Sequence, residues 1–283
     1  MRIEFENGTA LIRDLSDFDL KHTFDCGQCF RFDEVESGYE GVALGQYIRV
    51  LQTGDTFVLT PCSRQDFETK WKNYFDFGRD YACLFKGADS VLLEGLRCAG
   101  GLRILNQPPF ETLISFIISA NNNVKRIRGI VRRLCEKYGE QFEFEGRVFF
   151  DFPSSGVLAA LKPEDLAEIG AGYRAPYIIN ASKKIAEGFD LEALREKPYL
   201  EAKKAMTSLP GVGPKVADCV LLFSLGHSCA FPADVWIKRV LAQQYGFRGN
   251  DKQTVEFALE KFGKHAGIAQ QYLFFWIRER ENA

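Results

Sequence analysis

The sequence predicts an α+β fold, in which an antiparallel β domain at the N-terminus is followed by a helical body. Short stretches rich in Val, Phe and Tyr, separated by Gly, Ser and Asp, fill roughly the first 62 residues. From Ser63 onward the apolar residues recur with the period of a helix. A chain of 283 residues can form two domains with separate cores. We therefore expect an N-terminal β domain with flanking helices over residues 1–97 and a helical domain over residues 98–283.

The β domain is expected to be a meander of antiparallel strands. The separators "ESG" and "TGD" have the composition of hairpin turns, so neighbouring strands should pair directly. The expected strands are residues 29–35, 39–45, 47–53 and 56–62.

The helical part starts at residues 63–77, where Ser63 is a suitable N-cap. Residues 109–119 are too apolar for a surface helix and should run through a core, whereas residues 124–139 have an amphipathic pattern. The further expected helical segments are residues 162–170, 174–189, 191–209, 215–226, 234–246 and 252–280.

Charge and hydropathy exclude several classes of protein. The net charge of −2 and pI of about 6.0 argue against a protein that coats DNA with its whole surface, so any nucleic-acid binding must come from a local patch. The sequence has no apolar run of 18 residues and no apolar segment near its start, so neither a membrane span nor a secretory signal is expected. The expected location is the cytoplasm, in association with the nucleoid if the cell is prokaryotic.

The eight cysteines are scattered, and without an export signal we expect reduced thiols. Only Cys26 and Cys29 form a C-x-x-C pair. A zinc or iron–sulfur site would need a second pair or neighbouring histidines, which the sequence lacks. A metal site and a redox dithiol stay open as alternatives, but two small buried residues around Gly27 are the preferred interpretation.

The segment "LPGVGPKVADCVLLF", residues 209–223, places a glycine-rich turn between two helices. Gly211 and Gly213 permit positive φ and a close approach of the backbone, and successive N–H groups at a helix start suit a phosphate. The spacing does not match a nucleotide P-loop. A helix–hairpin–helix that grips a DNA backbone fits better, because phosphate contacts position a protein without reading sequence.

Lys215 follows Pro214, which suits the first helical position. A cation in the first turn opposes the helix dipole, at a cost of about 0.3–1 kcal/mol, and partial burial would lower the amine pKa further. That suits a nucleophile, because only the neutral amine attacks; the alternative is a solvated lysine on a phosphate. Nineteen residues on, Asp234 is a good N-cap, whose N–H bonds would keep it ionised beside a sugar that develops positive charge.

Residues 209–239 resemble the helix–hairpin–helix (HhH-GPD) DNA glycosylase superfamily. The segments "FDCGQCFRF" (24–32), "SANNNVKRIRGIVRRLCEKYG" (119–139), "GAGYRAPYI" (170–178) and "AGIAQQYLF" (266–274) are similar to the eukaryotic-type 8-oxoguanine DNA glycosylase/AP lyase. This resemblance spans nearly the whole chain. It implies a TATA-binding-protein-like antiparallel β domain packed on an α-helical HhH-GPD glycosylase body.

The resemblance also implies the activity: excision of 8-oxoguanine, expected opposite cytosine, from duplex DNA in base excision repair. Lys215 would be the nucleophile and Asp234 would support it. The nucleotide must be flipped out of the duplex to be reached. The amine would then attack C1′, the base would leave, and β-elimination from the Schiff base would cut the strand 3′ to the lesion. The carboxylate would stabilise oxocarbenium-like charge.

The family match places four residues around the flipped base. The carbonyl of Gly27 would accept the N7–H that 8-oxoguanine has and guanine lacks. Cys219 and Phe274 would form two walls, and Gln270 would read the Watson–Crick edge. Without the resemblance, plain core packing is the simpler explanation of Cys219 and Phe274.

The match also assigns a DNA-binding surface. The residues that would fill the gap in the duplex and hold the orphaned cytosine are Asn121, Arg126, Tyr173 and Arg174. Gly211 and Gly213 would form the hairpin that grips the DNA backbone. Arginine donors suit the acceptors of an unpaired cytosine, and a tyrosine can wedge between bases. Residues 123–133 carry five basic residues and no acid, which is the required local patch unless it is only a solvated helix face.

No cofactor is expected. The family implies a structural Na, K or Ca ion on the main-chain carbonyls of Thr207, Leu209 and Val212. An iron–sulfur cluster is not expected, because no cysteine follows Cys229; this argues against endonuclease III-like and adenine-mispair enzymes. The expected partner is damaged double-stranded DNA, and the chain is expected to act as a monomer.

Two positions depart from the family pattern, and three alternative functions remain. Trp236 stands where eukaryotic members usually carry a histidine near the lesion 5′-phosphate, and Pro214 replaces a more common polar residue. An alkyl-base glycosylase shares the β domain but lacks the lysine. A non-catalytic helix–hairpin–helix module would explain the hairpin but not Lys215 with Asp234. A thiol oxidoreductase lacks a thioredoxin-like βαβ context.

Overall fold

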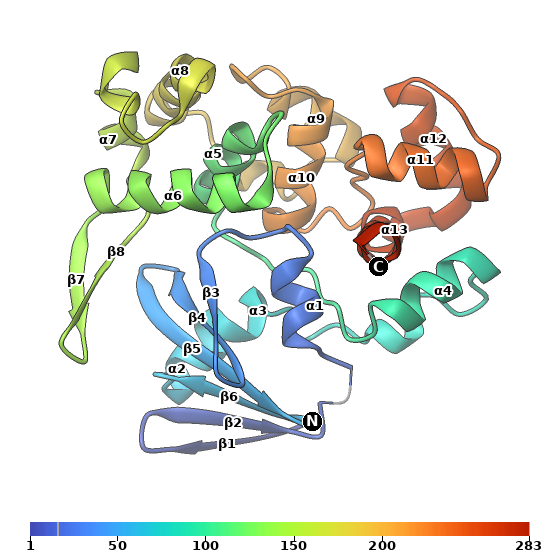
Figure 1. The fold of residues 1–283 in the computed structure, drawn as a ribbon, viewed down its shortest axis with the longest axis horizontal. Helices are drawn as coiled ribbons and strands as arrows, with labels where there is room; N and C mark the ends of the chain where they lie inside the picture. The colour runs from blue at the N-terminus through green and yellow to red at the C-terminus, as the bar shows by residue number, and fades with distance from the viewer. Residues whose placement is uncertain (16, 283) are drawn as a thin grey trace.

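A computed structural model describes residues 1–15 and 17–282. An antiparallel sheet from the N-terminal part packs beneath a larger group of helices, so the predicted α+β class is confirmed (Figure 1). No helix in the described ranges is long and apolar enough to cross a membrane.

The larger sheet has six antiparallel strands in the order β1-β2-β6-β5-β4-β3. The four predicted strands are confirmed, with tight turns at "ESG" and "TGD" that pair β3 with β4 and β5 with β6. A further hairpin precedes them, turning at Asn7 and Gly8, which both have positive φ. The strands are β1 (Arg2–Glu6), β2 (Thr9–Arg13), β3 (Phe32–Val35), β4 (Gly38–Ala43), β5 (Gln46–Thr53) and β6 (Thr56–Thr60).

Short helices cover the buried face of this sheet. Alternate residues such as Val50 and Leu59 point into a core rich in phenylalanine, as the two-residue period of a strand requires. Ser63 caps α2, its hydroxyl accepting from the Asp66 amide at 3.0 Å, as predicted. The covering elements are α1 (Leu20–Asp25), α2 (Arg64–Asp66), a π-helical turn (Phe67–Trp71) and α3 (Lys72–Tyr74).

The helical body is built around α5 (Pro109–Ser119), which is buried along nearly its whole length, as predicted. Three expectations need correction. Residues 191–209 do not form one helix: a 3-10 turn, Glu192–Leu194, is followed by the separate helix α9, because Pro198 interrupts the helical backbone. Residues 162–170 form only a 3-10 turn, Pro163–Leu166, and residues 252–280 form two helices because the chain turns at Gly263, where φ is 62°. The other helices are α4 (Ser90–Cys98), α6 (Val124–Tyr138), α7 (Ser155–Ala159), α8 (Ala175–Ala186), α9 (Tyr199–Met206), α10 (Pro214–Ser224), α11 (Val235–Gln244), α12 (Asp251–Phe262) and α13 (Ala266–Asn282).

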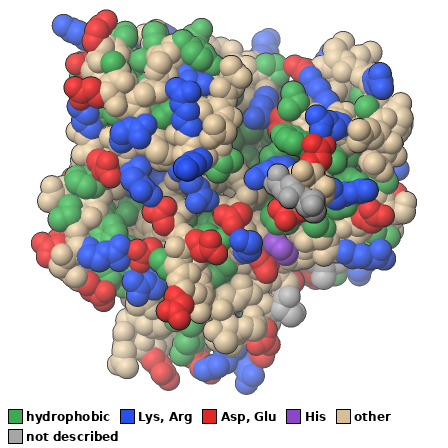
Figure 2. Space-filling model, viewed as in Figure 1, with side chains coloured by type: hydrophobic (Ala, Val, Ile, Leu, Met, Phe, Trp, Pro, Cys, Tyr) green, Lys and Arg blue, Asp and Glu red, His purple; other side chains and the backbone are tan. Residues whose placement is uncertain are grey.

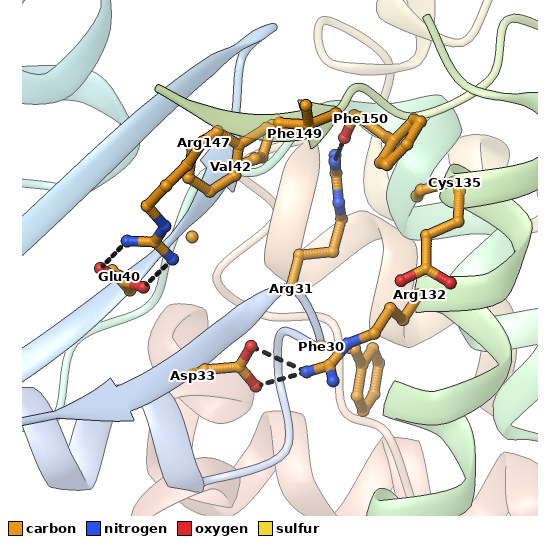
Figure 3. A pocket seen from close by; sticks show the side chains of 13 residues that line it. Phe30, Arg31, Asp33, Glu40, Val42, Arg132, Cys135, Arg147, Phe149 and Phe150 are labelled. Carbon is orange, nitrogen blue, oxygen red and sulfur yellow. Dashed lines mark hydrogen bonds and ion pairs between the residues drawn. The ribbon is translucent and has the colours of Figure 1, made fainter. Parts of the chain in front are cut away.

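A hairpin in the helical body reaches back to the large sheet. It consists of β7 (Gln141–Phe144) and β8 (Arg147–Phe150), which the sequence pattern did not predict. The Arg147 guanidinium donates to both carboxylate oxygens of Glu40 on β4, and Arg132 of α6 pairs with Asp33 of β3 (Figure 3). These ion pairs tie the two parts of the molecule together.

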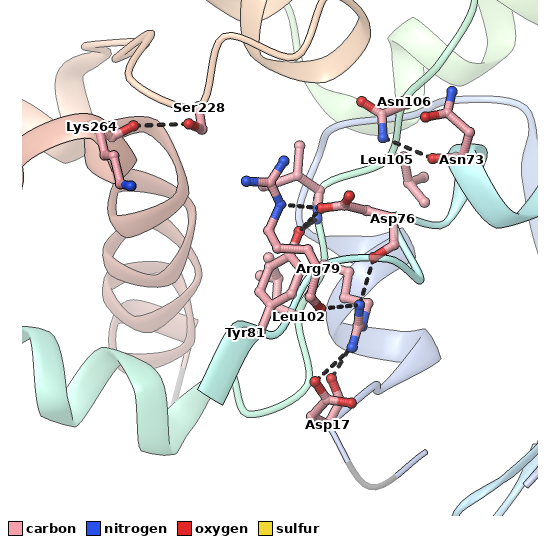
Figure 4. Close-up of polar contacts among 12 residues, drawn as sticks. Asp17, Asn73, Asp76, Arg79, Tyr81, Leu102, Leu105, Asn106, Ser228 and Lys264 are labelled. Carbon is pink, nitrogen blue, oxygen red and sulfur yellow. Dashed lines mark hydrogen bonds and ion pairs between the residues drawn. The ribbon is translucent and has the colours of Figure 1, made fainter. Parts of the chain in front are cut away.

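The connection between α4 and α5 is shared by both cores. Leu102 belongs to the core of the helical body, whereas Leu105 belongs to the core under the sheet. Between them the fully buried Arg103 donates to Asp17 and to the carbonyls of Asp76 and Arg79. These three partners are labelled in Figure 4. The two parts are therefore packed closely, and the boundary between residues 97 and 98 stays a prediction.

Candidate active site and DNA-binding surface

One small pocket brings together the six residues that were predicted for the catalytic and lesion-base site. They are Gly27, Lys215, Cys219, Asp234, Gln270 and Phe274. They come from the loop after α1, from α10, from the start of α11 and from α13, so only the tertiary fold places them side by side. The remaining lining residues are Cys26, Phe116, Phe223, Pro232 and Gln271. The cavity holds about 50 Å³, and the role of each residue in it stays a prediction.

Lys215 is the second residue of α10, directly after Pro214 at the first helical position, as predicted. Its side chain is exposed, so the protein on its own does not supply the partial burial that the sequence analysis considered. The ammonium has no ion pair or hydrogen bond within the described part of the chain. Burial raises the pKa values of Cys219 and Asp234, and the Lys215 charge opposes both increases. The ammonium is therefore close enough to both groups to affect them electrostatically.

Asp234 caps α11 as predicted, its Oδ1 accepting from the Ile237 amide at 2.9 Å. Burial is the largest influence on this carboxyl and raises its pKa above the usual value. The Ile237 amide and the Lys215 charge oppose burial without overcoming it. The expected N-cap bond is present and favours the ionised form, but burial outweighs it, so a half-buried acid with a raised pKa is held rigidly near the amine.

Two cysteines line the pocket, and both are poor thiolates. Burial raises the pKa of Cys219 to about 12 and that of Cys26 to about 12. The Cys26 thiol donates to the Thr23 carbonyl at 3.2 Å. Both thiols are therefore protonated near neutral pH and present a small apolar surface. Burial also raises the pKa of Cys29, so neither thiol of the C-x-x-C pair is a reactive thiolate, which disfavours the redox interpretation. No group of three or more His, Cys, Asp or Glu side chains within residues 1–15 and 17–282 could hold a metal ion.

Gln270 is 4% exposed, and its Oε1 has no hydrogen-bond partner. A buried acceptor without a partner costs about 1–3 kcal/mol, which a ligand with a matching donor would recover. Phe274 lies one turn further along α13, half-buried, with the Arg278 guanidinium 5.3 Å from its ring centre. The pocket therefore has an unpaired acceptor on its wall and an aromatic face beside it.

The loop that carries Gly27 is fixed by a residue that the sequence did not single out. Gln28 is fully buried; its Nε2 donates to the carbonyls of Thr23 (2.8 Å) and Arg103 (2.7 Å), and its Oε1 accepts from the Leu105 amide (2.9 Å). Gly27 itself has φ of +80°, a conformation that side chains rarely adopt. Two of the three hydrogen bonds of the Gln28 side chain join it to Arg103 and Leu105, more than 70 residues away in the chain. No local sequence pattern therefore reveals Gln28 as the anchor of this loop.

The hairpin between α9 and α10 uses its two glycines differently. Gly211 has φ of +79°, and a Cβ there would lie 2.5 Å from Cβ of Tyr177. Gly213 has φ of −84°, with nothing within 4 Å of the position of a Cβ, so the expectation of positive φ is wrong for this residue. Gly213 is the N-cap of α10 and has no side chain to cap the first amides of that helix. The carbonyls predicted to bind an ion belong to the same loop, at Thr207, Leu209 and Val212, and the ion stays a prediction.

Of the four residues predicted to contact the orphaned base, Asn121 lies in the loop before α6 and Arg126 in the first turn of α6. Tyr173 and Arg174 lie in the 3-10 turn Gly172–Arg174. Asn121, with φ of +49°, and Arg126 are exposed. Tyr173 is 59% exposed, and its hydroxyl donates to the Ala120 carbonyl at 3.2 Å. Arg174 is only 3% exposed and donates to the carbonyls of Ala120 and Asn121. In the protein alone the donors of Arg174 therefore hold the Asn121 loop, whereas the exposed Arg126 side chain has no hydrogen bond or ion pair among the residues that the structure describes.

The basic stretch of α6 is only partly free to bind DNA. Arg128 donates to the Phe24 carbonyl, Arg132 pairs with Asp33 and Arg133 donates to the Ile169 carbonyl. Lys125 and Arg126 have no side-chain ion pair within the described ranges. Lys and Arg side chains lie around a central depression on the face in Figure 2. The local patch therefore starts at the N-terminus of α6, beside Asn121.

A DNA-binding hairpin that leads into a lysine–aspartate pocket, packed against an antiparallel β domain, defines a DNA glycosylase of the helix–hairpin–helix class. The chain belongs to the HhH-GPD superfamily of base excision DNA repair proteins, whose family model matches residues 114–265. Residues 10–113 match the model described as 8-oxoguanine DNA glycosylase, N-terminal domain.

Individual proteins agree with this assignment. A probable N-glycosylase/DNA lyase of Methanothermobacter thermautotrophicus is 34% identical, over 92% of this chain and 93% of that protein. The 8-oxoguanine glycosylase/lyase of Clostridium acetobutylicum, solved with double-stranded DNA containing cytosine opposite 8-oxoguanine, superposes with a TM-score of 0.95 at 36% identity and covers 99% of both chains. A structure of MBOgg1 with a low-affinity DNA ligand gives a TM-score of 0.95 at 39% identity, also over 99% of both.

Proposed function

We propose that this protein is a bifunctional DNA glycosylase/AP lyase that excises 8-oxoguanine, opposite cytosine, from duplex DNA. The observation that carries the proposal is the single pocket in which Lys215, Asp234 and the four expected base-contacting residues meet. The family assignment supports the same reaction, as do the names of the related proteins.

In this proposal Lys215 attacks C1′ of the flipped nucleotide. The new bond from Nζ to C1′ forms as the bond from C1′ to the base breaks, and the base leaves with the bonding electron pair and takes up a proton. The adjacent carboxylate of Asp234 stabilises positive charge that develops on the sugar. The sugar ring then opens: the C1′–O4′ bond breaks, O4′ takes up a proton that leaves Nζ, and a protonated Schiff base forms between Nζ and C1′. Loss of a proton from C2′ of this Schiff base expels the 3′ phosphate by β-elimination.

Activation of the lysine has to fit its exposure. Because Lys215 is solvated in the protein alone, the burial that favours a neutral amine must come from DNA that covers the pocket. Its place in the first turn of α10 acts in the same direction, because the helix dipole disfavours an ammonium there. In this proposal the exposed Lys215 can contact a DNA phosphate before the damaged nucleotide enters the pocket, and it acts as the nucleophile afterwards.

Recognition of the base is assigned to the walls of the pocket. The Gly27 carbonyl would accept the N7–H of 8-oxoguanine, and the unpaired Oε1 of Gln270 would accept from the Watson–Crick edge. Cys219 and Phe274 would enclose the ring. A cavity of about 50 Å³ has room for only a few water molecules, so a purine enters only if a wall moves; the half-buried Phe274 is the candidate.

Several expectations belong to the same proposal. The chain acts on DNA as a monomer without a cofactor, in the cytoplasm or at the nucleoid. A monovalent or calcium ion on the hairpin carbonyls would stiffen the DNA-gripping loop between α9 and α10 without a step in the chemistry. The β domain over residues 1–97 and the helical domain over residues 98–283 are proposed as the two units.

The test compares duplexes that carry one 8-oxoguanine, one guanine or one 3-methyladenine opposite the natural partner. Strand cleavage is measured with and without alkali. We expect cleavage of the 8-oxoguanine strand without alkali, and none of the guanine strand. Lys215→Gln should abolish it, whereas Lys204→Gln, an exposed lysine of the neighbouring α9, should not. Cleavage only of the 3-methyladenine strand, and only after alkali, would replace this proposal with an alkyl-base glycosylase.

A further inference from the structure

A second and larger hollow lies next to the lesion pocket, between elements of both parts of the molecule. It encloses about 610 Å³ and is bounded by α1, the start of α6 and the end of α13. Its lining residues are Lys21, His22, Asp25, Cys98, Val124, Lys125, Arg128, Phe275, Arg278 and Glu279. A volume of this size accommodates a unit as large as a nucleotide.

The hollow is positively charged although the chain as a whole is acidic. Lys21, Lys125, Arg128 and Arg278 line it against only two carboxylates, Asp25 and Glu279. The cations are weakly paired. The Lys21 ammonium and one guanidinium nitrogen of Arg128 each lie 3.5 Å from an Asp25 oxygen, and Lys125 has no ion pair within the described ranges. A site with a surplus of loosely held cations attracts anions strongly.

The hollow adjoins the proposed path of the DNA. Arg278 links it to the lesion pocket, because its guanidinium lies over the Phe274 ring and donates to the Asp25 carbonyl at 3.4 Å. Lys125 stands in the first turn of α6, four residues after Asn121. A duplex that places its damaged nucleotide in the pocket and its orphaned base at Asn121 therefore passes over this hollow.

We propose that the hollow is a DNA-backbone site, and that the β domain contacts the duplex directly through Lys21 of α1. The proposal rests on the function proposed above and adds a partner surface that the helix–hairpin–helix alone does not supply. Phosphates of the strand beside the lesion would replace the loose contacts of Asp25 as partners of Lys21 and Arg128. The two parts of the molecule would then be held in one arrangement by the DNA itself.

The test measures the salt dependence of duplex binding for Lys21→Gln, with Lys125→Gln as the reference on α6 and Lys72→Gln as the control. The Lys72 side chain is 45% exposed, pairs with Glu68 on its own helical segment as Lys21 pairs with Asp25, and does not line the hollow. The plot of log K against log salt has a negative slope, and loss of one phosphate contact makes this slope shallower by about 1. The ratio of the Lys21→Gln Kd to the wild-type Kd should therefore fall about 3- to 4-fold between 50 and 200 mM salt. The Lys72→Gln slope should equal that of the wild type.

A second variant predicts the opposite sign. Asp25→Asn removes the carboxylate nearest to the proposed phosphates and should tighten binding at low salt. Wild-type slopes for Lys21→Gln, or weaker binding by Asp25→Asn, would overturn the proposal even if 8-oxoguanine excision is intact. If the wild type binds duplex with a slope that depends on Lys21 yet excises no 8-oxoguanine, the backbone site stands and the proposed reaction fails.

Discussion

Replacement of Gln28 tests how the lesion pocket is held in place. The Gln28 side chain is fully buried and makes three hydrogen bonds. The backbone carbonyl of Gln28 accepts a fourth from Nε2 of Gln107 at 2.7 Å. In Gln28→Leu the volume is nearly kept, but the Leu105 amide and the Arg103 carbonyl lose these partners; the Thr23 carbonyl retains the Cys26 thiol. Each buried group left unpaired costs about 1–3 kcal/mol, so the two groups together give a loss of about 2–6 kcal/mol.

Such a loss is a large part of the roughly 5–15 kcal/mol that stabilises an ordinary protein. We expect a decrease in Tm of about 5–15 °C, measured by calorimetry. Gln65→Leu, an exposed glutamine of α2, is the matched control and should change stability by less than about 0.5 kcal/mol. Below its Tm, Gln28→Leu should also excise 8-oxoguanine more slowly, because the Gly27 loop is no longer fixed. A Tm within about 2 °C of the wild type would refute the anchoring role.

Two further predictions concern the hairpin and the link between the two parts of the molecule. Gly211→Ala should weaken DNA binding and lower stability by about 1–3 kcal/mol, because its Cβ meets Tyr177 at a positive φ, whereas Gly213→Ala should fold normally; equal denaturation midpoints of the two variants would contradict this. The Arg147 hydrogen bond is the largest of the effects that lower the pKa of Glu40 to about 2. Since this folded-state pKa is depressed, the resulting stability is present above about pH 4.5 and is lost as the pH falls toward 2. Solvent screens the exposed arginine, so Glu40→Gln should lower the free energy of unfolding by only about 1–2 kcal/mol at pH 7, and by nearly nothing at pH 2–3. Urea unfolding at the two pH values measures this difference. A loss of stability that is independent of pH would contradict the ion pair.

The sequence predicts the parts of the fold that depend on local pattern. Strands β3–β6 follow from alternation and turn residues, and α5 follows from its continuous apolar run. The hairpin β7–β8 was missed because its stability comes from distant partners, with Arg147 bound to Glu40 and Phe149 packed against Tyr47. Helix α1 is only six residues long and carries too few periods to be recognised.

The pocket shows the same division. The resemblance placed Gly27, Lys215 and Gln270 in one site, and the structure brings them together. What it could not give is the state of each group: whether Lys215 is exposed, whether burial outweighs the cap at Asp234, and which residues support the loop. These properties depend on how tightly separate elements pack, and packing is not encoded in the spacing of a motif.

The central claim is that Lys215 forms a covalent bond with the sugar of an 8-oxoguanine nucleotide. The most direct measurement is borohydride trapping on a duplex with 8-oxoguanine opposite cytosine, with an undamaged duplex and Lys215→Gln alongside. The account predicts a protein–DNA adduct with the damaged duplex and the wild-type chain alone, and peptide mapping should place it on Lys215. Excision and strand cleavage without an adduct, or an adduct that persists in Lys215→Gln, would contradict it.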